Sequence, residues 1–175
     1  YRPEIMGHID RFVGWGETYH LQIVLNMHKA IGNYCDIPET VKLMDSLELQ
    51  ERFIALWVML EKRYAGKPAV VFELLNEVVN IDPERWNDLA EKTIKAIRQL
   101  NPDRRLIVGS RCWNAPSELK NLRVWDDLNV IYTFHCYAPF EFTHQRGVLQ
   151  PNSLYYNRAM AYPGDIGPYR EFYDL

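Results

Sequence analysis

Four short apolar runs recur along the chain, separated by longer amphipathic stretches. They lie at residues 21–27, 69–75, 105–108 and 130–134. Within each run the apolar residues are largely continuous rather than alternating, which is typical of strands that are buried on both faces, as parallel strands are. The pattern therefore predicts four buried, parallel strands.

The stretches between these runs carry helical periodicity. It is clearest over residues 47–64, where apolar side chains recur every three or four positions, at Leu49, Phe53, Leu56, Trp57 and Leu60. A second helix is predicted over residues 83–100, with Asp82 as its N-cap before a proline. A weaker pattern covers residues 117–122, and apolar residues at positions 6, 9, 12 and 13 predict a helix that leads into the first strand. This alternation predicts a parallel sheet with helical crossovers.

Polar residues gather at the carboxyl ends of the predicted strands. They are Asn26 and His28 after the first, Asn76 and Glu77 after the second, Ser110, Trp113 and Asn114 after the third, and His135 and Tyr137 after the fourth. In a parallel barrel this edge carries the active site. A doubly wound sheet usually has a glycine-rich first turn, and the chain contains no GxGxxG and no P-loop motif. The predicted fold class is therefore α/β, as a (β/α)8 TIM barrel.

Glu77 is the strongest candidate for chemistry, because it follows an apolar strand and an asparagine in the segment VVFELLNEV. A carboxylate at such a strand end is partly removed from water, which suits it to donate a proton near neutral pH. Asn76 beside it can orient a substrate hydroxyl or the carboxylate. A purely structural role stays open, in which Glu77 caps the following helix or pairs with an arginine.

Four further residues are weaker candidates. His28 ends the segment LNMH, where a histidine satisfied by a loop carbonyl is the more usual interpretation. His135 and Tyr137 form an H-x-Y pattern that directs both side chains to the same side if the strand pairing continues. Trp113 offers a flat apolar face beside the amide of Asn114, an arrangement that suits a sugar ring, although an ordinary buried tryptophan is about as good an explanation.

The composition of the chain limits the classes of binding partner that we expect. The chain has 175 residues, with 20 Lys and Arg against 23 Asp and Glu, so its net charge of −3 gives no reason to expect nucleic acid or an anionic membrane. No apolar run approaches the roughly 20 residues of a membrane helix. Cysteines at positions 35, 112 and 136 fit neither a disulfide framework nor a zinc site, and we predict free thiols. Without repeats or a Gly/Ser linker, residues 1–175 are expected to form one domain with no internal boundary.

Taken together, these segments resemble glycoside hydrolase family 5, the cellulases and their relatives. The resemblance rests on LNMH, VVFELLNEV, GSRCWNAPSEL, FHCYAPFEFTHQ and YPGDI in this order, and it covers nearly the whole chain. It implies a (β/α)8 barrel and a retaining hydrolase of β-linked glucans or related polysaccharides that uses no metal and no other cofactor. It also implies a secreted protein.

The resemblance assigns roles to individual residues. It implies that Glu77 is the general acid/base and that Asn76 contacts the 2-hydroxyl of the sugar. It also implies substrate-binding roles for His28 after the third strand of the barrel, and for His135 and Tyr137 after the sixth. Trp113 would be a stacking platform, with less support.

One part of the family pattern is missing. A retaining mechanism needs a second carboxylate as nucleophile, which the resemblance places after the seventh strand. The carboxylates that come after His135 are Glu141, Asp165, Glu171 and Asp174, and none of them follows an apolar strand. A TIM barrel has eight strands and typically takes about 250 residues or more, so the four strands predicted here are expected to be about half of one, strands three to six, completed by another segment or a second copy. The nucleophile is therefore expected outside this chain.

Three functions follow from these observations. The leading hypothesis is a retaining endo-β-glycanase acting on β-1,4-glucan. The second is a non-catalytic carbohydrate-binding segment, because the nucleophile is missing. The third is a metal-dependent hydrolase with His28, Glu77 and His135 as ligands, which we place last because the chain lacks an early HxH motif.

Overall fold

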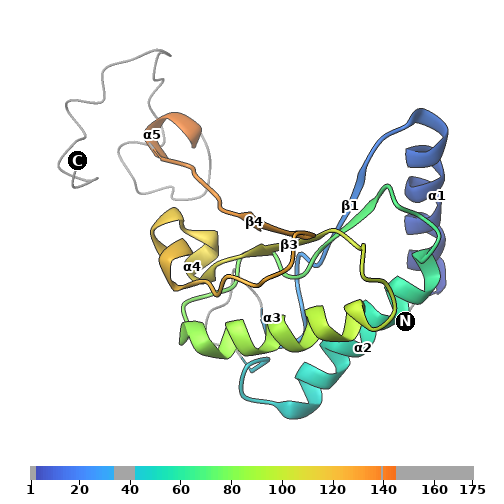
Figure 1. Ribbon diagram of the computed structural model, residues 1–175. Coiled ribbons are helices and arrows are strands. Elements are labelled where there is room, and N and C mark those ends of the chain that lie inside the picture. The colour runs from blue at the N-terminus through green and yellow to red at the C-terminus, as the bar shows by residue number, and fades with distance from the viewer. Residues whose placement is uncertain (1–2, 34–41, 139, 145–175) are drawn as a thin grey trace. The chain divides into compact units, whose positions relative to one another are not determined.

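The computed structural model describes residues 3–33, 42–138 and 140–144 (Figure 1). The chain divides into two compact units, Tyr1–His135 and Cys136–Leu175. The first unit contains the sheet and the long helices, and the second contains the short helix α5 (Phe140–Thr143). The expectation of a single domain over residues 1–175 stays a prediction.

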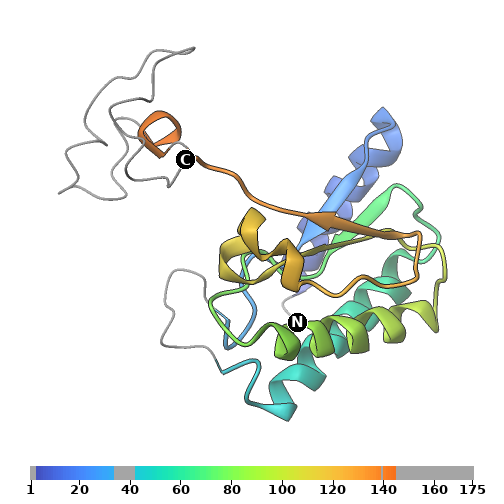
Figure 2. The same cartoon turned by 60° about the vertical axis from the view of Figure 1, so that its left-hand side comes forward.

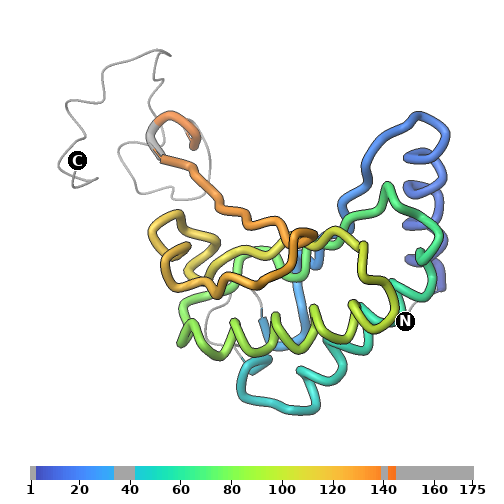
Figure 3. The backbone as a smooth tube through the Cα atoms, viewed as in Figure 1, coloured from blue at the N-terminus to red at the C-terminus, as the bar shows by residue number. Residues whose placement is uncertain are grey.

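The first unit is built on one parallel sheet of four strands in the order β1-β2-β3-β4. The strands are β1 (Ile23–Asn26), β2 (Val70–Glu73), β3 (Leu106–Gly109) and β4 (Val130–Thr133). Three of them are shorter than the apolar runs that predicted them, and β3 is as long as its run but begins one residue later. After each of the first three strands the chain crosses back and enters the next strand in the same direction (Figure 3). Spatial order therefore equals chain order, as in successive strands of a barrel.

Two of the three long helices match their predicted ranges closely, and the first contains the apolar positions 6, 9, 12 and 13 that predicted a helix there. The three helices are α1 (Pro3–Tyr19), α2 (Leu47–Tyr64) and α3 (Pro83–Arg98). The Asp82 side chain caps α3 by accepting a hydrogen bond from the Glu84 N–H at 3.0 Å, as predicted. Ser46 caps α2 in the same way, from the Leu49 N–H. The predicted helix over 117–122 is instead a 3₁₀ helix, η2 (Pro116–Asn121), preceded by the four-residue element α4 (Arg111–Asn114).

The core lies between the sheet and helices α2 and α3, which cover the same face (Figures 1 and 2). Trp57 of α2 packs on Phe72 of β2 with ring centroids 5.0 Å apart. Leu106 and Val108 of β3 are fully buried on the same face. Large apolar side chains at helical spacing on α2 thus meet alternate residues of the central strands.

The prediction that every strand is buried on both faces is wrong for the two edge strands. Val24 of β1 and Ile131 of β4 are 47% and 42% exposed, whereas Val71 of β2 is 2% exposed. Alternate residues of a strand point to opposite faces, and in the described residues the long helices cover one face only (Figure 1). The uncovered face corresponds to the interior of a closed barrel, which side chains from the other strands would fill.

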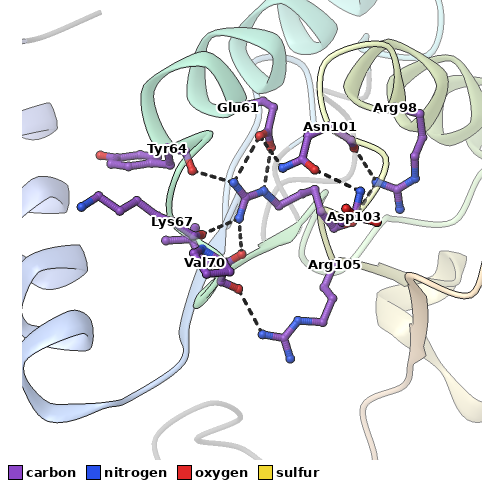
Figure 4. Close-up of polar contacts among 10 residues, drawn as sticks. Glu61, Tyr64, Lys67, Val70, Arg98, Asn101, Asp103 and Arg105 are labelled. Carbon is purple, nitrogen blue, oxygen red and sulfur yellow. Dashed lines mark hydrogen bonds and ion pairs between the residues drawn. The ribbon is translucent and has the colours of Figure 1, made fainter.

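A buried ion pair joins α2 to the amino-terminal end of β3 (Figure 4). The guanidinium of Arg104 lies 2.6 Å from the Glu61 carboxylate, and the two side chains are 1% and 0% exposed. The same guanidinium donates to the carbonyls of Tyr64, Lys67 and Val70 at 2.6–2.8 Å. A single side chain therefore satisfies the backbone where α2 ends and β2 begins.

Candidate active site

The carboxyl edge of the sheet brings Glu77 and His135 together. Glu77 Oε1 lies 2.9 Å from His135 Nδ1, and the two side chains are 22% and 23% exposed. Glu77 follows β2 and His135 follows β4, so the contact spans the end of β3 between them. The pair is open enough to meet a ligand, and the imidazole fixes the orientation of the carboxyl group.

The backbone around Glu77 holds this residue at the carboxyl edge of the sheet. Leu74 and Leu75, after β2, are buried, and the Leu74 N–H donates to the Ile107 carbonyl at 3.1 Å. Glu77 itself has a φ of 47°, in the left-handed region that non-glycine residues rarely adopt. Such strain costs about 1–3 kcal/mol and is characteristic of functional sites.

Asn76 is held more tightly than its neighbour. Its side chain is largely buried, at 5% exposure, and its backbone N–H donates to the Met27 carbonyl at 2.9 Å. This bond ties the end of β2 to the end of β1, which leads to His28. The proposed contact of Asn76 with a substrate hydroxyl stays a prediction.

Element α4 is a left-handed turn rather than an α-helix. Cys112, Trp113 and Asn114 have φ values of 53°, 58° and 58°; we call these three residues the left-handed turn. Trp113 is 40% exposed, which leaves part of its indole face accessible. Asn114, by contrast, is fully buried, so the expectation that its amide lies beside the indole face to bind sugar hydroxyls is wrong. The unexpected backbone conformation directs the two side chains to different environments.

His28 lies outside this pair, and Tyr137 is described in the other compact unit of the chain. His28 is exposed after β1 and, within the described residues, shares no hydrogen bond or ion pair with Glu77 or His135. Tyr137 belongs to the second unit, where its ring packs against His144 with centroids 5.4 Å apart. The roles assigned to His28 and Tyr137 therefore stay predictions.

The described residues contain no group of three or more His, Cys, Asp or Glu side chains that could hold a metal ion, so His28, Glu77 and His135 do not form such a group.

Cys112 and Cys136 are free, as predicted, whereas Cys35 lies outside the described residues. Burial raises the pKa of the Cys112 thiol, which disfavours the nucleophilic thiolate. In the part of the chain that the structure describes, no helix is long and apolar enough to cross a membrane.

Comparison with known protein families shows which family this chain belongs to. The family model "Cellulase (glycosyl hydrolase family 5)" matches residues 1–163. The chain belongs to glycosyl hydrolase family 5. The predicted resemblance is thereby confirmed, and Glu77 and His135 lie within the matched range.

The names of similar proteins agree with this assignment. Endoglucanase C of Acetivibrio thermocellus is 40% identical over 173 residues, covering 98% of this chain and 50% of that protein. Cellodextrinase A of Ruminococcus flavefaciens is 36% identical over 149 residues, covering 83% of this chain and 44% of that protein. The family 5 chain described here thus spans about half the length of these relatives.

Solved structures also match this chain over about half of their own length. Thermotoga maritima Cel5A in complex with cellobiose has a TM-score of 0.75 and 30% identity, covering 99% of this chain and 56% of that one. CcsZ, a cellulose synthase subunit of Clostridioides difficile, has a TM-score of 0.74 and 27% identity, covering 92% of this chain and 50% of that one. The predicted fold, part of a (β/α)8 barrel, is confirmed.

Sequence reasoning missed one polar pair in this family 5 chain. The Asn26 amide at the end of β1 donates to the Glu73 carboxylate at the end of β2. The strand register places Asn26 beside Glu73, and Glu73 beside Ile107, on the face that the long helices leave uncovered. A charged residue inside the otherwise apolar run VVFELL was the signal that could have found it.

Proposed function

We propose that the protein carrying this chain is a retaining endo-β-1,4-glucanase in which Glu77 is the general acid/base. The contact of Glu77 with His135 at the carboxyl edge of a parallel sheet carries the proposal. This edge is where barrel enzymes place their catalytic groups. Family membership, and relatives named endoglucanase at 40% identity, support hydrolysis of a β-linked glucan.

Glu77 acts twice in this mechanism. In the first step its carboxyl group gives a proton to the glycosidic oxygen as the bond to the leaving sugar breaks. In the second step the resulting carboxylate takes a proton from the water that releases the sugar from the enzyme. His135 orients the carboxyl group throughout, because its ring nitrogen lies 2.9 Å from Oε1.

The nucleophile belongs to a part of the protein beyond this chain. A retaining enzyme needs a second carboxylate about 5–5.5 Å from the first. Relatives about twice as long support the presence of further barrel strands that carry it. Closure by such strands would also cover the exposed side chains Val24 and Ile131 on the edge strands.

The sugar-binding surface surrounds Glu77. Trp113 supplies an accessible indole face for stacking, and the Trp113 N–H donates to the Val78 carbonyl at 2.8 Å, directly after Glu77. Asn76 would bond the 2-hydroxyl of the sugar at the cleavage point. His28 and Tyr137 would contact neighbouring hydroxyls, and a β-1,4-glucan is the polysaccharide partner.

The test compares Glu77→Gln with Glu73→Gln in the complete protein. Glu77→Gln should lower kcat on cello-oligosaccharides by about 10²–10⁴-fold, the usual contribution of a general acid/base. With an aryl β-cellobioside whose leaving group needs no protonation, the burst of released phenol should persist. Glu73→Gln makes the same chemical change four residues earlier, at the end of β2, and keeps an oxygen for Asn26, so its kcat should stay within about threefold.

Other outcomes reject the assignment. If Glu77→Gln retains its kcat on cello-oligosaccharides within a few fold, Glu77 is not the acid/base. If the wild-type complete protein binds these sugars saturably and releases no product over long incubation, the non-catalytic carbohydrate-binding function replaces the enzyme.

A further inference from the structure

The left-handed turn is conformationally costly, and its neighbours hold it in place. Side chains bearing a Cβ disfavour positive φ, and of the three residues only Asn114 is of a type that tolerates it well. Three such residues in succession persist only where surrounding contacts impose the conformation. The contacts that do so are therefore a guide to what the turn is for.

Main-chain hydrogen bonds connect the left-handed turn to both members of the Glu77–His135 pair. On one side the Trp113 N–H donates to the Val78 carbonyl at 2.8 Å, one residue after Glu77. On the other side the Asn114 carbonyl accepts from the His135 N–H at 2.9 Å. Two consecutive residues of the turn thus join the backbone beside the proposed acid/base to the backbone of its imidazole partner.

Arg111 strengthens the first of these connections. Its guanidinium donates to the Ile81 carbonyl at 2.6 Å and is held by the Glu118 carboxylate at 2.6 Å. The Cys112 N–H adds a longer bond, 3.4 Å, to the Val79 carbonyl. The segment that follows Glu77 is therefore fastened along several residues to the turn.

The Asn114 side chain packs the left-handed turn against Gly109 of β3; we call this contact the seat. It is fully buried, and neither its amide nitrogen nor its amide oxygen has a hydrogen-bond partner in the part of the chain that the structure describes. A Cβ built on Gly109 would lie 2.4 Å from the amide nitrogen. Gly109 is itself fixed, because its carbonyl accepts from the buried Trp86 indole N–H at 2.8 Å. The amide therefore rests directly on the strand, in a space that only glycine leaves open.

We propose that the left-handed turn is a clamp that sets the geometry between Glu77 and His135, with Asn114 as its positioning residue. The proposal rests on the proposed role of Glu77. Asn114 acts through the His135 backbone, and Trp113 through the backbone beside Glu77, so no contact of Asn114 with substrate is required. Disturbing the seat on Gly109 should therefore impair turnover more than substrate binding.

The experiment uses Gly109→Ala, Asn114→Gly and the double variant of the complete protein, with cellopentaose as substrate. Gly109 has no left-handed φ, so alanine suits its backbone and adds only a methyl group against Asn114. Gly109→Ala should lower kcat at least tenfold and leave KM within threefold. Asn114→Gly removes the amide but keeps the left-handed backbone accessible, so its kcat should fall by about threefold, clearly less than that of Gly109→Ala. The double variant, which removes the clash, should return to the Asn114→Gly value.

Asn114→Ala separates backbone conformation from the amide. It deletes the same amide as Asn114→Gly but disfavours positive φ, so its kcat should be about tenfold lower than that of Asn114→Gly. Equal kcat values for these two variants would overturn the proposal. So would a double variant as impaired as Gly109→Ala, or a folded Gly109→Ala variant with wild-type kcat. If Gly109→Ala does not fold, recovery of folded, active protein in the double variant supports the seat.

Glu77→Gln distinguishes failure of the clamp from failure of the proposed function. An inactive Glu77→Gln variant together with an unimpaired Gly109→Ala variant rejects the clamp alone. A fully active Glu77→Gln variant rejects the function on which the clamp depends. Thermal unfolding of each variant, measured in parallel, shows whether a loss of kcat merely follows a loss of folded protein.

Discussion

The Arg104 guanidinium and the Glu61 carboxylate form a buried ion pair, with Nε 2.6 Å from Oε2, at the end of the sheet away from Glu77. The Asn101 side-chain amide donates a hydrogen bond to the other oxygen of the Glu61 carboxylate, Oε1, at 2.8 Å. The guanidinium also lies 4.9 Å from the centre of the Phe72 ring. In barrels the amino-terminal end of the strands serves stability, and this pair has the position and the burial for that task.

Arg104→Met should destabilise the protein by about 3–5 kcal/mol, because it leaves a buried carboxylate without its cation. Three backbone carbonyls lose their donor at the same time. Urea unfolding of the complete protein measures the effect as a change in the free energy of unfolding. Replacing Glu61 as well, by leucine, should recover part of the loss, since the unpaired charge is then removed.

An exposed ion pair on α2 provides the matched control. Arg52 lies 3.8 Å from Glu48, and the two side chains are 59% and 79% exposed. Arg52→Met should change the free energy of unfolding by less than about 0.5 kcal/mol. Similar losses for Arg52→Met and Arg104→Met would show that burial of the Arg104 pair does not determine its contribution.

His135→Ala should lower kcat on cello-oligosaccharides by about 10²-fold with little change in KM, because Glu77 loses the group that orients its carboxyl. Steady-state kinetics at the pH of maximal activity measures both constants. His8→Ala serves as the control, because His8 lies exposed on α1 and should leave kcat unchanged. A His135→Ala variant with raised KM and unchanged kcat would instead assign His135 to substrate binding alone.

Trp113→Ala should raise KM for cellopentaose about fivefold, the equivalent of about 1 kcal/mol of lost stacking, while kcat changes little. The control is Trp15→Ala, which removes another half-exposed indole, 52% exposed, from helix α1. Fluorescence titration with cellopentaose gives the binding constants directly. Equal affinities of Trp113→Ala and wild type would remove Trp113 from the binding surface.

The regular elements were predictable because periodicity reports on a buried face. Trp57 and Leu60 repeat at helical spacing, and α2 covers the range predicted from them. The strand positions followed from apolar runs, but the exposure of Val24 and Ile131 did not. Hydrophobicity identifies side chains that are buried in the complete fold. It does not show whether the residues that bury them belong to the described part of this chain.

The site was predictable only in outline. Glu77 and His135 were both expected at the carboxyl edge, because parallel strands bring their ends to one side. The positive φ at Glu77, Cys112 and Trp113 carries no sequence signal, since glycine, the usual marker, is absent, and the asparagine at position 114 is a weak signal by itself. Arg104 and Glu61 are 43 residues apart, and composition alone could not pair them.

Glu118 couples the stability of the loop after β3 to pH. Hydrogen bonds from Asn121 at 2.8 Å and from Arg111 at 2.6 Å hold the pKa of the Glu118 carboxyl below its ordinary value of 4.5. A depressed pKa in the folded state stabilises the fold above the unfolded value, and this contribution is lost as pH falls through the folded value. Glu118→Gln should therefore cost about 1 kcal/mol at pH 7.

The cost of Glu118→Gln should shrink as pH falls below 4.5 and approach zero once wild-type Glu118 is itself protonated in the folded state. Urea unfolding of wild type and variant at several values between pH 7 and pH 3 provides the measurement. A cost that stays constant over this range would show that the glutamine disturbs packing rather than charge. Because Glu118 holds Arg111, and Arg111 holds the Ile81 carbonyl after Glu77, the same acid range should also loosen the backbone beside the proposed acid/base.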